Sequence, residues 1–183
     1  MTSALKVASY VNSRLPIAPY DTKKLQKLIY FSEAWHVAWT GRKLFPEPFE
    51  AWPDGPVVRS VFGYQNNEGV PPYDGTGLTD EHISVIESVL DHYGHLSYQE
   101  LVDLSHAHAP WVEVREGLAP STPSRRQLRE ATIARFYTQL AIADDESPRR
   151  RLEVEYADLE QALEIGRGSS QEWREGLDLL ATQ

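Results

Sequence analysis

The sequence predicts a mainly α-helical protein: a compact helical domain with a short strand or hairpin near residues 44–53, followed by a C-terminal amphipathic helical extension. Three observations predict this fold class. Apolar residues recur at helical spacing in most segments, Pro and Gly fall between those segments, and two prolines interrupt the segment 43–52. The length of 183 residues suits one domain with an appendage.

The first predicted helix covers residues 3–15 and ends where two prolines follow. Asp21 or Thr22 then caps a second helix, whose apolar stripe continues for about five turns. Gly41 ends this helix as a left-handed C-terminal glycine. Its tryptophans are expected to lie in the core, since they share the stripe with leucine and isoleucine.

The segment EAWPDGPV contains a turn. Phe49–Trp52 predicts a short strand, and Pro53-Asp54-Gly55 is typical of a tight turn. Pro56 is favoured at the first position of a helix, so a third helix is predicted from there to about Asn66. Trp52 is expected to be a core aromatic, whose loss costs about 3–5 kcal/mol.

Three more helices are predicted in the same domain. Thr79 caps a helix with an acidic first turn. Ser97 with Glu100 forms a capping box that begins the next helix. The last of the three covers residues 125–142, with a serine as its cap.

We predict two units, a helical domain over residues 1–143 and an acidic amphipathic helical tail over residues 144–183. The tail holds 11 acidic and 5 basic side chains, whereas the first unit holds 16 acidic and 13 basic side chains. Apolar positions recur along the tail at narrow, heptad-like spacing. An apolar stripe needs a surface to cover it, so these positions are the candidate partner contacts: Leu152, Tyr156, Leu159, Leu163, Trp173 and Leu177.

Composition excludes several classes of function. The chain has no cysteine, so disulfides, thiolate nucleophiles and thiolate metal sites are excluded. The formal net charge of −9 disfavours nucleic acid as a partner. Neither a signal peptide nor an apolar run of membrane-spanning length is recognisable, so we expect a cytoplasmic protein without a membrane partner.

The candidates for chemistry are weak. No nucleophile elbow, phosphate loop or helical metal-binding pair occurs, so we expect no catalytic residue, no metal and no cofactor. A small enzyme with a pocket of His36, His106, His108 and carboxylates remains a lesser alternative. The basic clusters Lys23-Lys24-Lys27 and Arg149–Arg151 are expected to be solvated or paired with acidic groups.

Two stretches resemble a known family. Residues 22–62 read TKKLQKLIYFSEAWHVAWTGRKLFPEPFEAWPDGPVVRSVF, and residues 93–111 read YGHLSYQELVDLSHAHAPW. Together they are similar to the two signatures of the Panacea antitoxin domain, the family of SocA-like and GepA-like proteins, and the similarity covers about residues 3–140. The matching positions to which the resemblance gives a structural role are Lys27, Tyr30, Trp35, His36, Trp52, Gly55, Pro56, Val57, Pro110 and Trp111.

The resemblance implies an antitoxin that is not an enzyme. Its partner would be a co-expressed toxin, neutralised by direct protein–protein binding, in a toxin–antitoxin system of the kind linked to phage defence. One branch of the family implies an alternative, an adaptor that delivers the toxin to a protease. The apolar stripe of the tail would contact the toxin, the chain's own domain or a second copy in a homodimer.

Overall fold

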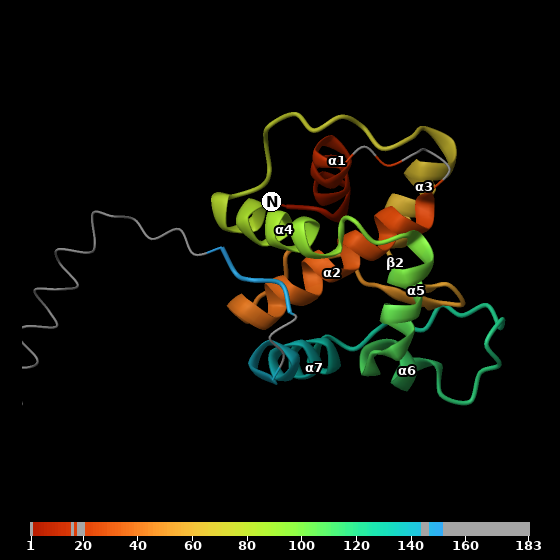
Figure 1. The fold of residues 1–183 in the computed structure, drawn as a ribbon. Coiled ribbons are helices and arrows are strands. Elements are labelled where there is room, and N and C mark those ends of the chain that lie inside the picture. Colours follow the sequence, from red (N-terminus) through yellow and green to blue (C-terminus); the bar gives the residue numbers. More distant parts are fainter. Residues whose placement is uncertain (1, 16, 18–20, 144–146, 152–183) are drawn as a thin grey trace, which may run out of the picture. The chain divides into compact units, whose positions relative to one another are not determined.

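The computed structural model describes residues 2–15, 17, 21–143 and 147–151. In this part of the chain seven helices accompany one two-stranded antiparallel sheet, which confirms the mainly α fold class (Figure 1). None of the helices described is long and apolar enough to cross a membrane. The elements in chain order are α1 (Ala4–Arg14), α2 (Thr22–Thr40), β1 (Glu50–Trp52), β2 (Gly55–Val57), α3 (Arg59–Asn67), α4 (Asp80–Tyr93), α5 (Tyr98–Ala107), α6 (Ala109–Arg115) and α7 (Glu130–Ala143).

Helix α2 is the centre of the domain. Every residue from Leu25 to His36 is buried. The cause is visible in Figure 1, where α2 runs through the middle of the domain, and its neighbours include α1, α4, α5, α7 and β2. Trp35 is fully buried, and its indole N–H donates to the Tyr93 hydroxyl at 3.1 Å. A helix buried on all sides fixes the positions of the elements around it.

The predicted caps of α2, α4 and α5 are confirmed. The Asp21 carboxylate accepts from the Lys24 amide at 3.2 Å, and Gly41 ends α2 in the left-handed conformation with φ +69°. Thr79 caps α4 in a capping box, with His82 rather than an acid at the third position. A second capping box, from Ser97 and its partner glutamate, begins α5 as predicted.

The prediction of a helix starting at Pro56 is wrong. Gly55–Val57 forms β2, which pairs antiparallel with β1 in the register Glu50–Val57, Ala51–Pro56 and Trp52–Gly55. Helix α3 begins later, at Arg59. The turn at 53–54 therefore closes a hairpin, and the fixed φ of Pro56 serves an extended segment as readily as a helix start.

The prediction of a helix over residues 125–142 is wrong in its first turn, since α7 begins at Glu130. Residues 126–128 run beside β1 instead. The Ala51 amide donates to the Arg126 carbonyl at 2.8 Å, and the Leu128 amide donates to the Phe49 carbonyl at 2.9 Å. These bonds cover the outer edge of β1, and an unpaired strand edge would otherwise remain there.

Two predictions stay untested. The division into residues 1–143 and 144–183 remains a prediction. The proposed contact residues of the tail, from Leu152 to Leu177, all lie outside the described residues.

Candidate functional site

The hairpin is held on α2 by two adjacent polar side chains. The Gln26 amide accepts from the Val58 N–H at 2.8 Å and donates to the Val58 carbonyl at 3.5 Å. The Lys27 ammonium nitrogen donates to the Pro56 carbonyl at 3.0 Å. The side chains of α2 thus satisfy backbone groups of β2 and the residue after it, in place of a third strand.

Gly55, in β2, lies against Lys27 of α2 and Ser105 of α5. Its φ is +96°, a conformation that side chains resist. A Cβ atom built there would lie 2.6 Å from Lys27 Cε and 2.7 Å from Ser105 Oγ. Ser105 and Lys27 are themselves at most 1 % exposed, so neither can move away into solvent. The hairpin can approach the helices this closely only because residue 55 has no side chain.

The environment of Lys27 disfavours its charge. Burial lowers the pKa of Lys27 to about 7, while the nearby Asp54 carboxylate opposes this shift and Lys23 adds to it. Asp54 forms an ion pair with Lys23 at 3.0 Å. The expectation that the cluster Lys23-Lys24-Lys27 is solvated is therefore wrong for Lys27, which a helix stripe carries into the core.

Helices α5 and α6 contribute an aromatic stack to the same place. The rings of His106 and Trp111 are parallel within 15°, with centroids 3.8 Å apart. The indole N–H of Trp111 donates to the Trp52 carbonyl at 3.0 Å. The Arg115 guanidinium lies 5.1 Å from the Trp111 ring and donates to the Ala51 carbonyl at 2.8 Å. We call Lys27, Trp52, Gly55, Pro56, His106 and Trp111 the hairpin cluster.

Trp52 is half-buried rather than a core residue. Its ring packs edge-on against Phe62, with centroids 4.8 Å apart, and its indole N–H donates to Glu50 at 2.7 Å. Trp52→Ala should therefore lower the free energy of unfolding by less than the loss of about 3–5 kcal/mol expected for a fully buried aromatic.

The remaining signature positions lie in the core or at a helix start. Tyr30 is fully buried and meets Phe49 and Tyr137 edge-on, with centroids 5.3 and 6.0 Å away. Val57 is 5 % exposed, in β2. Pro110 is buried in the first turn of α6, where its missing N–H costs no helical hydrogen bond.

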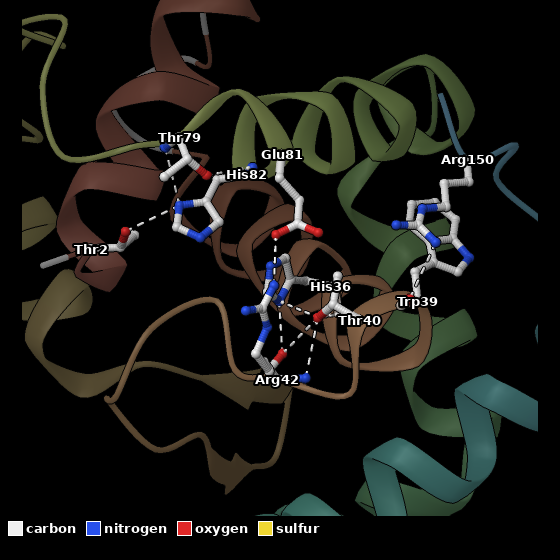
Figure 2. A network of polar contacts seen from close by, with 9 residues as sticks. All are labelled: Thr2, His36, Trp39, Thr40, Arg42, Thr79, Glu81, His82 and Arg150. Carbon is white, nitrogen blue, oxygen red and sulfur yellow. Dashed lines mark hydrogen bonds and ion pairs between the residues drawn. The ribbon is translucent and has the colours of Figure 1, made fainter. Parts of the chain in front are cut away.

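His36 belongs to a separate network at the C-terminal end of α2 (Figure 2). Its Nδ1 lies 2.7 Å from the Arg42 carbonyl, and its ring packs edge-on against that of His82, 5.3 Å between centroids. Arg42 in turn pairs with Glu81 at 3.0 Å. Burial lowers the pKa of His36, although the hydrogen bond to the Arg42 carbonyl opposes that shift.

The three histidines of the enzyme alternative have different surroundings. His36 contacts the Arg42 loop, His106 stacks on Trp111, and His108 Nδ1 lies 2.8 Å from the Tyr137 hydroxyl. An open depression of about 680 Å³ is lined by Thr2, residues 43–46, residues 77–79 and His82, and by none of the three. Among the residues described, no group of three or more His, Asp or Glu could hold a metal.

Glu33 is a buried acid that the sequence reading did not single out. It is 3 % exposed, and its Oε2 accepts from the backbone amides of Leu44 at 2.8 Å and Phe45 at 3.3 Å. Burial raises the pKa of Glu33 to about 7, against the lowering effect of those two hydrogen bonds. The signal for this burial in the sequence was that Glu33 is the one charged residue of the segment 28–35, LIYFSEAW.

Comparison with known families identifies the domain. Residues 25–112 match the family described as "Antitoxin SocA-like, Panacea domain". No curated protein and no solved structure matches the chain. The matched range begins in α2 and ends in α6, so it contains the whole hairpin cluster. The resemblance found in the sequence is confirmed over residues 25–112, which match the family of SocA-like antitoxins with a Panacea domain.

Proposed function

We propose that the chain is a cytoplasmic antitoxin that neutralises a co-expressed toxin by direct protein–protein binding. The match of residues 25–112 to the antitoxin family is the observation that carries this proposal. The family implies a toxin as the partner in general terms and a role that is not enzymatic. Direct binding, rather than delivery to a protease, is the finer claim that needs a test.

The geometry of the hairpin cluster supports a scaffold role for the signature residues. Lys27 and Trp111 donate to carbonyls of the hairpin itself, at Pro56 and Trp52. Their polar groups are thus engaged within the fold instead of facing a substrate. This favours a domain whose signature residues maintain its shape, with partner recognition left to other surfaces.

We place part of the toxin contact on the tail. Its apolar stripe includes Tyr156 and Trp173, residue types that anchor protein interfaces, and Leu159 adds apolar area to the same stripe. The acidic side chains around the stripe would attract a basic toxin surface and speed association, while the apolar positions would slow dissociation.

The test is co-expression of the tagged chain with the product of the neighbouring gene. We expect rescue of growth and co-purification of both proteins in a fixed ratio. The double variant Tyr156→Ala, Leu159→Ala should dissociate about tenfold faster or more. The matched control Gln161→Ala, at a polar position between the stripe residues, should behave as the wild type.

Two results would contradict direct binding through the tail. Toxin that disappears from cells only when a protease is present would favour the adaptor. A double variant that associates with itself less, yet binds toxin unchanged, would assign the stripe to a homodimer.

A histidine variant separates binding from chemistry. His106→Ala should retain both toxin binding and growth rescue, because the His106 ring packs on Trp111 and our proposal gives it a structural role. His106 is a cleaner test than His108, which is 7 % exposed and bonded to Tyr137. Thermal unfolding should show a decrease of about 1 kcal/mol in the free energy of unfolding, because the stacking of His106 on Trp111 is lost. Unchanged binding with lost rescue would instead indicate an enzyme.

A further inference from the structure

The outer face of α4 holds an extended segment of the same chain, residues 147–151, which we call the strap. The Ser84 hydroxyl donates to the Arg151 carbonyl at 2.8 Å, and the Arg151 amide donates to the Ser88 hydroxyl oxygen at 3.3 Å. Ser88 also donates its own hydroxyl hydrogen to the Ser84 carbonyl, at 2.9 Å. Two serines one helical turn apart therefore satisfy both backbone groups of one strap residue.

The same face of α4 also binds the side chain of that residue. The Arg151 guanidinium pairs with the Asp91 carboxylate and lies 3.9 Å from Glu87 Oε2. Glu87 is held in place by the Tyr10 hydroxyl and by Arg14 Nε, both 2.6 Å from Oε1. The carboxylate that Arg151 approaches is thus positioned by α1 and does not depend on the strap for its orientation.

A second arginine of the strap reaches the C-terminal end of α2. Arg150 Nη1 donates to the Trp39 carbonyl at 3.3 Å (Figure 2). This carbonyl belongs to the last turn of α2, where backbone oxygens lack helical partners and a positive charge is favoured. Arg149, by contrast, is exposed and makes no hydrogen bond or ion pair with another described residue.

We propose that α4, through Ser84, Glu87, Ser88 and Asp91, and the C-terminal end of α2 form a docking site for an extended arginine-bearing segment. Its occupant is the strap of the same chain. The site reads the backbone and side chain of Arg151 and the side chain of Arg150, so two of three successive arginines are recognised by position and not by charge alone. Docking fixes the point on the domain from which residues 152–183 continue. This inference does not depend on the proposed antitoxin function.

The test uses the full chain without any partner. Amide hydrogen exchange should show slow exchange at Arg151 in the wild type. The double variant Ser88→Ala, Asp91→Asn removes the hydroxyl that accepts from the Arg151 amide and the carboxylate charge that pairs with its side chain. It should speed exchange at that amide about 5- to 30-fold. Amides in the middle of α2 should exchange at the wild-type rate, which shows that the domain remains folded.

Two arginine variants of equal charge provide the matched control. Arg151→Ala should speed amide exchange at position 151, whereas Arg149→Ala should leave exchange at that position unchanged. Should the double variant destabilise the core, Ser84→Ala tests the same docking site at a more exposed position, because it removes the hydroxyl that donates to the Arg151 carbonyl. Equal effects of the two arginine variants, or unchanged exchange at Arg151, would overturn the docking site. Protection that appears only with dimer formation in light scattering would overturn the intramolecular occupant, because a second copy would then supply the strap.

Discussion

Gly55→Ala is expected to lower the free energy of unfolding by about 2–5 kcal/mol, because strain and overpacking act together. The backbone φ of +96° is unfavourable for any residue with a Cβ atom. The new methyl group would also lie 2.6 Å from Lys27 Cε and 2.7 Å from Ser105 Oγ. Both neighbours are buried, so the hairpin would have to move away from α2 and α5, and its contacts with Trp111 would be lost. Gly55→Val should be worse and leave little folded protein.

Gly41→Ala is the matched control for this prediction. Its φ of +69° is also positive, but a Cβ there would meet no heavy atom within 4 Å. The expected loss is the conformational part alone, about 1–2 kcal/mol. Urea denaturation of both variants measures the difference. Equal losses at the two glycines would show that the close approach of Lys27 and Ser105 contributes nothing.

The local signals in the sequence predicted the helices well. Asp21, Thr79 and Ser97 were recognisable as caps because a capping side chain acts within three residues of itself. The apolar stripe of α2 predicted that one face of this helix is buried. The structure buries every face from Leu25 to His36, which only tertiary packing can do.

The non-local features could not be read from the sequence. Pro56 is compatible with a strand and with a helix start, and the pairing with Ala51 that decides between them is a tertiary contact. The start of α7 was misplaced because residues 126–128 pair with the edge of β1, about 75 residues earlier in the chain. The burial of Lys27 depends on the hairpin that covers it. The resemblance located Lys27 and Gly55 as signature positions, but the contact between them required coordinates.

The stability of the domain is expected to rise with pH above 7 because of Lys27. The folded state holds this amine with a pKa of about 7, against 10.5 for an unburied lysine. Between these values the unfolded chain binds the extra proton, so raising the pH favours the folded state. Between pH 7 and 9.5 this group should raise the free energy of unfolding by about 2–3 kcal/mol. Below pH 7 both states bind the proton, so the group causes no further change there.

Glu33 should lower the stability of the domain as the pH rises, over a lower pH range than Lys27. Burial raises its pKa from 4.5 to about 7, so here the folded state binds the extra proton between these values. Stability from this group is therefore complete below pH 4.5 and is lost as the pH rises to 7. His108 offsets most of this loss between pH 4.5 and 6.5, because burial lowers its pKa from 6.5 to about 4 and its contribution to stability rises with pH over that range.

Denaturant unfolding from pH 5 to 9.5 measures both slopes, and two nearly isosteric variants assign them. Lys27→Met keeps the side chain as far as Cε and removes the titrating amine, so the rise in stability above pH 7 should flatten. Glu33→Gln keeps an oxygen acceptor for the Leu44 and Phe45 amides and removes the titrating acid. Its stability should therefore rise with pH relative to the wild type between pH 5 and 7, while the rise above pH 7 persists. A Lys27→Met protein with the wild-type rise would show that Lys27 is charged in the folded state at neutral pH, and that the hairpin tolerates a buried ammonium beside Gly55.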